Sequence, residues 1–379
     1  MGGRFIVTYR VFATTKPEAL ARAEDVALEQ TVEIPRHVVP AGYVEDVVLG
    51  RVEAVAREEG GTWAARISYA PDAVGEELPQ LLNVIFGNSS IQKGLKVTAL
   101  DLGPVMSARF RGPRFGAQGL RHLTGRKIGG FVCPVIKPQG SSSADLAALA
   151  YATARAGADI VKEDHGLANQ PAAPFRDRIP MLAEAVARAN AERRMAGDST
   201  RALYFPNIGG HADQIREDAY FAKAAGADGI LMIPGIQGFD AINRLARDPG
   251  FGLPIMAHPA HLGPYVLSPD TGYSHGMMLG TLMRLAGADI SVFPNNGGRF
   301  GFSLAECQDI VSACSTPDGP GLPILPSPGG GMSIERLPDM LRLYGPDCVY
   351  LLGGSLLRFG DRIGDAIGAM RAALDQNET

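Results

Sequence analysis

Hydrophobic and polar positions follow one pattern near the N-terminus and a different one in the rest of the chain. Near the N-terminus, alternation of β-branched and aromatic residues with polar ones predicts strands over residues 4–12, 47–56, 62–69 and 95–102. Apolar positions at helical spacing predict helices over residues 17–29 and 77–86. Strands mixed with two helices in about 120 residues indicate a small α+β domain.

From Gly129 onward the pattern becomes a strand followed by a helix, repeated to the end of the chain. The predicted strands cover residues 131–137, 159–163, 202–206, 229–234, 254–258, 289–293, 322–325 and 349–352. The predicted helices cover residues 143–156, 178–195, 212–225, 238–247, 274–286, 303–314, 333–343 and 360–376. Eight such units in about 250 residues are typical of a (β/α)8 barrel.

Two further observations favour the barrel over a doubly wound sheet. The string Ala-Gly-Ala-Asp recurs at residues 156–159, 225–228 and 286–289, each time where a helix ends and the next strand begins. A doubly wound sheet would be expected to carry a GxGxxG turn after its first strand, and the sequence has none. We therefore predict an α/β protein with an α+β domain over residues 1–125 and a barrel that holds the active site over residues 126–379.

Composition narrows the range of partners. The 379 residues are 46% hydrophobic and 20% charged, which is typical of a globular protein, and the net charge of −4 gives no reason to expect nucleic acid or an anionic membrane as partner. No apolar stretch approaches the roughly 18 to 20 residues of a membrane span, and the first residues lack the apolar core of a signal peptide. The four cysteines show no CxxC spacing, so we expect reduced thiols and a cytoplasmic protein.

The strongest local signal is the run from Asp159 to His165, in which a short apolar strand ends in Lys162, Glu163, Asp164 and His165. Such a cluster is costly to bury unless a metal, a substrate or mutual pairing offsets the desolvation of its charges. Barrel active sites lie at the C-terminal ends of the strands. The polar or glycine residues at the other predicted ends are Lys137, Asn207, His258, His261, Asn295, Asn296, Ser327, Gly329, Gly330, Gly331, Gly353, Gly354 and Ser355.

Each of these candidates also has a simpler interpretation. Lys162, Asp164 and His165 suit a divalent metal such as Mg²⁺, or they form a salt-bridged strand end. Lys137 suits a phosphate or a carbonyl oxygen, or it lies on the surface, and His258 is a base, a ligand or simply a hydrogen-bonded side chain. Glycine turns after the last two strands suit a phosphate, because backbone N–H groups can approach an anion only where side chains are absent. Arg176-Asp177-Arg178 is expected to pair charges internally.

At these residues the sequence resembles the large chain of the RuBisCO superfamily, and within it the non-carboxylating RuBisCO-like proteins of form IV. The resemblance covers nearly the whole chain and implies a ferredoxin-like N-terminal domain followed by a (β/α)8 TIM barrel. The strings that carry it are Val135-Ile136-Lys137-Pro138, Gly157-Ala158-Asp159-Ile160-Val161-Lys162-Glu163-Asp164-His165, Asn169-Gln170-Pro171 with Arg176-Asp177-Arg178, Gly329-Gly330-Gly331 and Gly353-Gly354.

The resemblance implies a role for each matching residue. Lys162 stands at the lysine that CO₂ carbamylates and that binds Mg²⁺, Asp164 at a metal-ligand carboxylate, and His165 where the family has a glutamate ligand. Lys137 occupies the position of a lysine that contacts the substrate during enolisation, and His258 the position of the family's histidine at the end of the strand predicted over residues 254–258. The residues implied to bind one phosphate are Gly330, Gly331, Gly353 and Gly354, and those implied to reach into the partner of a homodimer are Glu29 and Asn88.

Departures from the family pattern bear on the reaction. Gln139 replaces the lysine that handles the carboxylated intermediate, and Pro259 replaces an arginine of the second phosphate site. The predicted strand over residues 289–293 offers Val292 and Phe293 in place of a phosphate-binding histidine. Arg299 is the cation nearest to the position of the missing lysine of the mobile loop. Carboxylation of ribulose bisphosphate is therefore not expected.

The sequence thus predicts an enzyme that enolises, and so isomerises or decarboxylates, a ketose or sugar acid carrying one phosphate, through an enediolate that Mg²⁺ stabilises. The resemblance implies relatives that act on methylthio-pentose phosphates and others that decarboxylate branched sugar-acid phosphates. Two alternatives stay open. One is a Schiff-base enzyme like the class I aldolases, with Lys162 or Lys137 as the nucleophile. The other is an inactive barrel that acts as a ligand-binding or regulatory protein.

Overall fold

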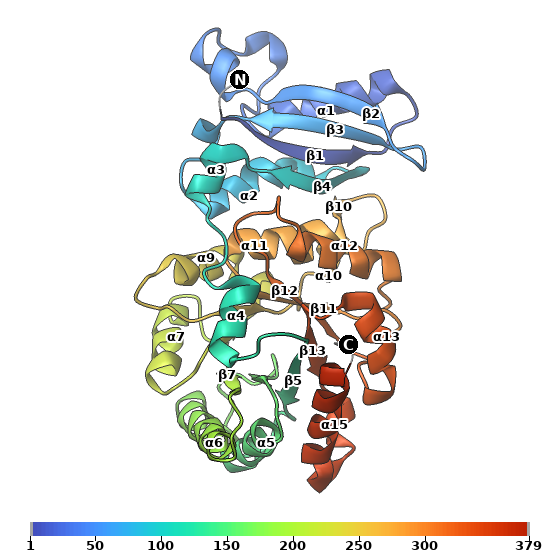
Figure 1. The fold of residues 1–379 in the computed structure, drawn as a ribbon. Helices are drawn as coiled ribbons and strands as arrows, with labels where there is room; N and C mark the ends of the chain where they lie inside the picture. Colours follow the sequence, from blue (N-terminus) through green and yellow to red (C-terminus); the bar gives the residue numbers. More distant parts are fainter. Residues whose placement is uncertain (1–2, 377–379) are drawn as a thin grey trace.

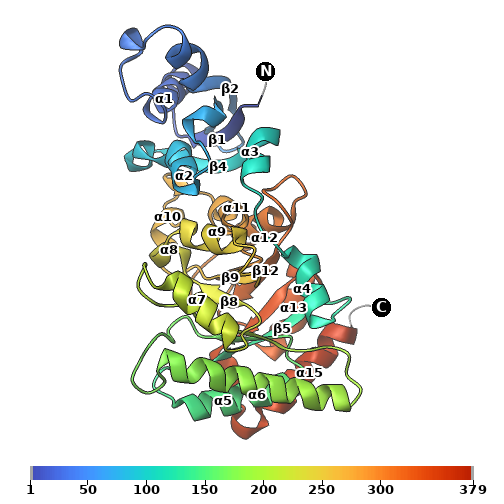
Figure 2. The same ribbon diagram turned by 90° about the vertical axis from the view of Figure 1, so that its left-hand side faces the viewer.

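The computed structural model describes residues 3–376 and has an N-terminal sheet domain stacked on the side of a barrel (Figure 1). In both views three outer helices of the barrel lie between the sheet domain and the barrel strands (Figure 2). They are α9 (Phe239–Arg247), α11 (Leu282–Ala286) and α12 (Leu304–Ser315). This is the two-part architecture expected from the sequence. The position of the boundary at residue 125 stays a prediction.

The N-terminal domain has the βαββαβ order of a ferredoxin-like fold. Its elements are β1 (Phe5–Val11), α1 (Lys16–Glu29), β2 (Arg51–Arg57), β3 (Trp63–Tyr69), α2 (Leu78–Phe86) and β4 (Leu95–Asp101). The strands β4-β1-β3-β2 pair antiparallel in that order, and every second residue of β1 is buried, which is why its alternating sequence forms a strand with one face toward a core. A short strand of the barrel domain, β10 (Gly272–Tyr273), extends this sheet beside β4.

The strand predicted over residues 47–56 begins only at Arg51, so its first part was predicted wrongly. Residues Val44–Val48 form a helical turn with the wide hydrogen-bond spacing of a π-helix. The guanidinium of Arg4 donates hydrogen bonds to the carbonyl oxygens of Val47 at 2.7 Å and Leu49 at 2.8 Å. These carbonyl groups are therefore satisfied by a side chain and need no neighbouring strand.

The second domain is a closed barrel, as predicted. In the part of the chain that the structure describes, its parallel strands are β5 (Phe131–Ile136), β6 (Ile160–Glu163), β7 (Leu203–Phe205), β8 (Ile230–Met232), β9 (Ile255–Ala257), β11 (Ile290–Pro294), β12 (Leu325–Gly329) and β13 (Val349–Leu352). They form the ladders β13-β5-β6-β7 and β8-β9-β11-β12, which meet at the bridge between Asn207 and Leu231 and at the contact between β12 and β13.

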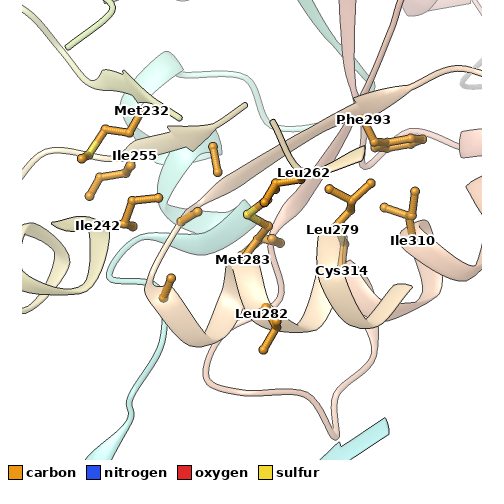
Figure 3. Packing of buried hydrophobic residues seen from close by; sticks show 14 of the residues in the cluster. Met232, Ile242, Ile255, Leu262, Leu279, Leu282, Met283, Phe293, Ile310 and Cys314 are labelled. Carbon is orange, nitrogen blue, oxygen red and sulfur yellow. The ribbon is translucent and has the colours of Figure 1, made fainter. Parts of the chain in front are cut away.

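Helices surround this barrel on the outside. They are α5 (Ser143–Arg155), α6 (Phe175–Met195), α7 (Ile215–Ala224), α9, α11 with the preceding π-type turn Met277–Thr281, α12, α13 (Leu337–Tyr344) and α15 (Ile363–Gln376). Buried apolar side chains fill the layer between strands and helices, as Figure 3 shows for Ile255 of β9 against Ile242 and for Leu279 and Met283. Within residues 3–376, no helix is both long and apolar enough to cross a membrane.

Strand β12 lies further along the chain than the predicted strand 322–325. Its sequence contains Pro326 and Pro328, which cannot donate ladder hydrogen bonds and so conceal a strand from a pattern based on β propensity. The hydroxyl of Ser327 donates a hydrogen bond to the carbonyl oxygen of Val349 at 3.0 Å and joins β12 to β13. Ser327 is therefore a buried part of the barrel wall, and its prediction as a strand-end site residue was wrong.

The repeated Ala-Gly-Ala-Asp string has a common structural role. Each aspartate lies one or two residues before a strand and accepts a hydrogen bond from a backbone N–H of a neighbouring strand. The pairs are Asp159 with Val132 at 2.8 Å, Asp228 with Tyr204 at 3.1 Å and Asp289 with Ile255 at 2.9 Å. The repeat thus fixes neighbouring strands at the N-terminal end of the barrel and leaves the opposite end for the site.

Candidate active site

A cavity of about 680 Å³ opens at the C-terminal ends of the strands. Val135, Val292 and Leu351 belong both to its lining and to the apolar core inside the barrel, so the cavity lies directly on that core. The predicted site residues that line it are Lys137, Lys162, Asp164, His165, His258, Arg299, Gly329, Gly330, Gly331, Gly353, Gly354 and Ser355. The fold thus brings together residues that are more than 200 positions apart in the sequence.

Lys162 is the most buried ionisable residue of the cavity lining, with only 1% of its surface exposed. Side chains alternate along β6, so Lys162 points into the barrel and Glu163 points toward the helices. The Lys162 amine donates a hydrogen bond to the carbonyl oxygen of Glu163 at 2.8 Å. Burial lowers the pKa of Lys162 to about 8, against the attraction of Asp164. A neutral amine is therefore accessible near physiological pH.

Asp164 lies between Lys137 and His165. Its Oδ1 is 3.4 Å from Lys137 Nζ and 3.4 Å from His165 Nδ1. Burial alone would raise the pKa of Asp164, but the hydrogen bond from His165 and the charges of Lys162 and Lys137 hold this pKa well below its ordinary range. A Cβ atom on Gly353 would lie 3.9 Å from Lys137 Nζ, so the glycine turn after β13 runs close to the same lysine.

His258 is a neutral ring with a defined tautomer. Its Nδ1 accepts a hydrogen bond from the backbone N–H of Ala260 at 3.2 Å, so the proton of the neutral ring is on Nε2. The ring stacks on His165, with centroids 4.0 Å apart. Burial lowers the pKa of His258 well below its ordinary value, and the charge of Lys162 lowers it further. His258 can therefore donate a hydrogen bond from Nε2 into the cavity.

Glu163 does not belong to the cavity. Its carboxylate receives hydrogen bonds from Arg178 at 2.8 Å and 3.2 Å, from the hydroxyl of Tyr204 at 2.8 Å and from the backbone N–H of Asn207 at 3.0 Å. Both charged side chains of the pair are fully buried. Arg178 also donates to the carbonyl oxygens of Ala168 and Ala173 and so positions the loop after β6. The internal charge pairing predicted for Arg176-Asp177-Arg178 is thus found at Arg178, whereas Arg176 pairs with Glu217 at the surface.

The asparagines at predicted strand ends hold loops and do not line the cavity. Asn207 donates to the carbonyl oxygens of His165 at 3.1 Å and Leu167 at 2.8 Å, and so fixes the loop that carries His165. Asn295 is buried and accepts a hydrogen bond from the hydroxyl of Tyr344, and Asn296 donates to the carbonyl oxygen of Phe302. These residues position the site without forming its surface.

The glycine turns, Gly329–Gly331 after β12 and Gly353–Gly354 after β13, line the cavity with backbone. Gly330 and Gly331 have φ values of 79° and 74°, a conformation that favours glycine. The loop from β11 to α12 packs directly on the first turn, because a Cβ atom on Gly298 would lie 2.6 Å from the carbonyl oxygen of Gly330. Arg336 fastens this loop by donating to the carbonyl oxygens of Gly331 at 2.9 Å and Asn296 at 3.0 Å. The loop thereby brings Arg299 to the cavity.

Another part of the cavity wall is apolar. It comes from the segment after β9 and from neighbouring elements, and its residues are Pro259, Leu262, Val266, Leu267, Leu279, Phe293, Phe302 and Met332. His261 lies in this segment with a φ of 69° and does not line the cavity. The sequence positions expected to have lost the second phosphate site, Pro259 and Phe293, thus form an apolar surface. One cavity combines charged and apolar walls.

Comparisons with known proteins agree with this architecture. The family model of the ribulose bisphosphate carboxylase large chain, catalytic domain, matches residues 117–294. A 5-methylthioribulose-1-phosphate isomerase from Rhodospirillum rubrum is 37% identical over 376 residues, which cover 99% of this chain and 97% of the relative. The chain belongs to the RuBisCO large-chain family. Within this family it is a RuBisCO-like protein, as the resemblance in its sequence predicted.

Further members of the family support the same placement. A crystal structure of a RuBisCO-like protein from Rhodopseudomonas palustris superposes with a TM-score of 0.84 and 34% identity, covering 100% of this chain and 99% of that one. A 2,3-diketo-5-methylthiopentyl-1-phosphate enolase from Bacillus pumilus is 32% identical over 314 residues, which cover 81% of this chain and 76% of the relative. Two of these three relatives are thus named as enzymes of the isomerase and enolase type.

The metal site that family membership implies fits this RuBisCO-like protein only under one condition. Asp164 is the only carboxylate that lines the cavity, and no three His, Cys, Asp or Glu residues come close enough to hold a metal, among residues 3–376. One carboxylate and one imidazole are a poor ligand set for Mg²⁺, which prefers several oxygen atoms. A carbamate on Lys162 would add a second anionic oxygen group beside Asp164. The donor set fits Mg²⁺ when Lys162 is carbamylated.

Glu29 and Asn88 lie together on the N-terminal domain of this RuBisCO-like protein. The side-chain amide of Asn88 donates to Glu29 Oε1 at 2.9 Å. The buried side chain of Gln30 donates to the carbonyl oxygens of Asn83 and Val84 and accepts from the backbone N–H of Ser89, so it fixes both segments. The structure brings the two predicted residues to each other but not to the cavity of their own chain.

Two arginines that shape the site of this RuBisCO-like protein were not predicted from its sequence. Arg358 lines the cavity after the second glycine turn, and Arg336 fastens the loop that carries Arg299. For Arg358 the available signal was its spacing of four residues from Gly354, which places both on one side of a helical turn. The contacts of Arg336 join segments 40 residues apart, and no local pattern indicates them.

Proposed function

We propose that this chain is an enolising enzyme that removes a proton from the carbon next to a carbonyl group of a sugar-type substrate with one phosphate. The observation that carries the proposal is a single cavity that combines the glycine turns, the cluster of Lys137, Lys162 and Asp164, and an apolar wall. The glycine turns suit a phosphate. The lysine cluster suits proton transfer and enolate stabilisation, and the apolar wall suits a substrate end that has no second phosphate.

Each side chain of the cluster has a distinct role in this proposal. The amine of Lys137, or the carbamate group of Lys162 once it has formed, accepts the proton from the substrate carbon. Ionised Asp164 orients Lys137 through their contact at 3.4 Å. The Nε2–H of His258 donates a hydrogen bond to the oxygen that becomes negative as the proton leaves. The apolar core beneath the cavity and the apolar wall of the cavity exclude water from these groups.

We further propose that carbamylated Lys162, Asp164 and His165 hold Mg²⁺. When bound, Mg²⁺ would act as a Lewis acid on the oxygen atoms of the substrate. The lowered pKa of Lys162 supports carbamylation, because CO₂ reacts with the neutral amine. His165 already contacts Asp164 and needs only to release this hydrogen bond to become a ligand.

For the substrate, we propose a five-carbon ketose or diketose 1-phosphate with an apolar group at its other end. The names of the relatives, a 5-methylthioribulose-1-phosphate isomerase and a 2,3-diketo-5-methylthiopentyl-1-phosphate enolase, support this class. The test compares kcat/KM for 5-methylthioribulose 1-phosphate, the diketo compound and ribulose 1,5-bisphosphate. We expect one of the methylthio compounds to be preferred by roughly a hundredfold or more, because the apolar wall offers the second phosphate no partner. Equal turnover of the bisphosphate would contradict the proposal.

The Schiff-base alternative has one observation in its favour, the buried amine of Lys162 with its lowered pKa. Borohydride reduction in the presence of a ketose phosphate would trap such an adduct as a mass increase on Lys162 or Lys137. A substrate that is turned over without any trapped adduct would count against this alternative. The inactive-barrel alternative is disfavoured by the convergence of Lys137, Lys162 and Asp164 on one cavity.

We also propose a homodimer in which Glu29 and Asn88 of one chain reach the cavity of its partner. Their position supports it, because they form one exposed group on the N-terminal domain and do not line the cavity of their own chain. We also propose a cytoplasmic location, where thiols stay reduced. It is supported by the cysteines, which are all buried free thiols: Cys133, Cys307, Cys314 and Cys348.

A further inference from the structure

We propose that Arg358 binds the phosphate group of the substrate and supplies the fixed positive charge of the phosphate subsite. This inference rests on the proposed function, because it concerns the same cavity. Backbone N–H groups of the glycine turns provide only partial charges, and a phosphate dianion in a partly enclosed cavity needs a full positive charge to offset its desolvation. This charge must come from one of the cationic side chains that line the cavity.

The cations that line the cavity, within residues 3–376, are Lys137, Lys162, Arg299 and Arg358. Lys137 already contacts Asp164 at 3.4 Å, and Lys162 is buried and donates to the carbonyl oxygen of Glu163. Arg299 is carried by the β11–α12 loop, where its guanidinium lies 4.7 Å from the ring centroid of Phe300. Arg358 makes no ion pair and no side-chain hydrogen bond with any other described residue. It is thus an exposed cation of the cavity wall that has no carboxylate partner among the described residues.

The local backbone directs Arg358 toward the second glycine turn. Gly354–Leu357 form one helical turn, and Arg358 continues it with helical dihedral angles, φ −65° and ψ −21°. Residues four apart in a helix lie on the same side, and helical side chains lean toward the N-terminus of their helix. The Arg358 side chain therefore leans back over Gly354, where a Cβ atom would meet nothing within 4 Å. Gly354 and Arg358 both line the cavity, so the open backbone of the turn and the arginine face the same space.

A neighbouring carboxylate does not remove this charge. Hydrogen bonding by Ser333 is the main reason why the pKa of Glu335 is lowered, and the charge of Arg358 is a smaller one. The two residues form no ion pair in the described part of the chain, and Glu335 is exposed to solvent. A guanidinium can bind two phosphate oxygens at once, which a lysine at the same position could not do.

Isothermal titration with inorganic phosphate tests this inference directly on the full chain, because it needs no turnover. We expect R358A to weaken phosphate binding by roughly tenfold or more, and R358K to give an intermediate loss, because it keeps the charge without the paired donors. R362A is the matched control, since Arg362 lies four residues further on and is exposed like Arg358, but does not line the cavity. It should stay within about twofold of the wild type.

Steady-state kinetics with the preferred methylthio substrate give a second measurement. A phosphate contact made equally in the ground state and in the transition state should raise KM in R358A and leave kcat within a few-fold, roughly. If R358A does not fold, R358K and R358Q replace it, and R358Q should lose more phosphate affinity than R358K. Phosphate affinity in R358A within about twofold of the wild type, or a wild-type protein that binds no phosphate, would overturn the inference. Phosphate binding that depends on Arg358 in a protein that enolises nothing would overturn the proposed function alone.

Discussion

At the scale of single residues, β6 shows two ways in which this fold buries a charge. Glu163 on the outer side of the strand is neutralised by Arg178 and further hydrogen bonds, and contributes to the wall of the barrel. Lys162 on the inner side has a single hydrogen bond to a carbonyl oxygen, and its pKa falls to about 8 in response to burial. Two adjacent residues of β6 thus carry charges of different kinds: Glu163, paired with Arg178, has a structural charge, and Lys162 has a reactive one.

The structural charge leads to a stability prediction. R178M should lower the free energy of unfolding by about 3 to 5 kcal/mol, because it leaves Glu163 buried without its partner. Urea unfolding measures the loss, and the double variant E163Q/R178M should recover part of it. The control is R176M, because Arg176 is an exposed arginine that pairs with Glu217 on the surface, and its loss should stay below about 1 kcal/mol. Equal losses in R178M and R176M would contradict the structural role of the pair.

The reactive charge leads to a prediction about pH. At fixed dissolved CO₂ in the presence of Mg²⁺, the carbamate on Lys162 should increase from pH 7 to 9, because the neutral amine fraction rises about tenfold per pH unit below its pKa and levels off above it. ¹³C NMR with labelled bicarbonate measures the signal, and K162A provides the blank. A signal that persists in K162A, or that falls as the pH rises, would refute carbamylation at this residue.

At the scale of elements, the site depends on how loops pack on one another. The β11–α12 loop lies on the first glycine turn with almost no side chains between them, as the close approach of Gly298 to Gly330 shows. Arg336 holds the two together through carbonyl oxygens of Gly331 and Asn296. Arg299 therefore reaches the cavity through this contact, and its position depends on a residue that does not itself line the cavity.

Removing this contact should loosen the loop without unfolding the barrel. R336A should raise KM for a phosphorylated substrate by roughly tenfold and make residues 296–300 more susceptible to limited proteolysis, since two hydrogen bonds that order the loop are lost. R336K should restore part of both. The matched control is R342A, because Arg342 is an exposed arginine of α13 that pairs with Asp339 on the surface. Identical proteolysis and KM in R336A and R342A would argue against a positioning role.

Elements also show what the sequence could and could not predict. The eight strand–helix units were predictable because buried strands and amphipathic helices leave periodic patterns. The position of β12 was not, because Pro326 and Pro328 resemble a loop, and their missing donors are offset by a contact of Ser327 that only the closed barrel provides. The cavity residues at strand ends were predictable from barrel geometry. Arg336 and Arg358 were not, because their roles depend on loops that meet only after folding.

At the scale of the whole molecule, the N-terminal domain is attached to the site of its own chain through the segment after β9. This segment contributes Leu262 and Val266 to the apolar wall and then joins the N-terminal sheet through β10. Lys96 of β4 donates to the carbonyl oxygen of Ser268 at 2.7 Å and strengthens the connection. Glu29 and Asn88 belong to the same domain but not to this junction, which leaves them available for a second copy of the chain.

The proposed homodimer predicts complementation between inactive variants. E29A and K162A should each lack activity, but mixed dimers have one site with both intact residues. Subunit exchange of equal amounts should therefore restore activity to about a quarter of the wild type, because about half of the dimers are mixed and each has one working site. N88A should complement K162A in the same way. A monomer with full activity in sedimentation and assay, or no recovery on mixing despite exchange, would contradict this arrangement.

Lys162 is proposed to serve an enzyme that enolises a phosphorylated substrate. The most direct test of this claim is the incorporation of solvent deuterium next to the carbonyl group of 5-methylthioribulose 1-phosphate and of the diketo compound, followed by ¹H NMR in D₂O with Mg²⁺ and bicarbonate. The wild type should catalyse the exchange, and K162A should lose it by at least about a hundredfold while its circular dichroism and urea unfolding stay unchanged. No exchange on either compound, or a folded K162A within about tenfold of the wild type, would contradict the claim.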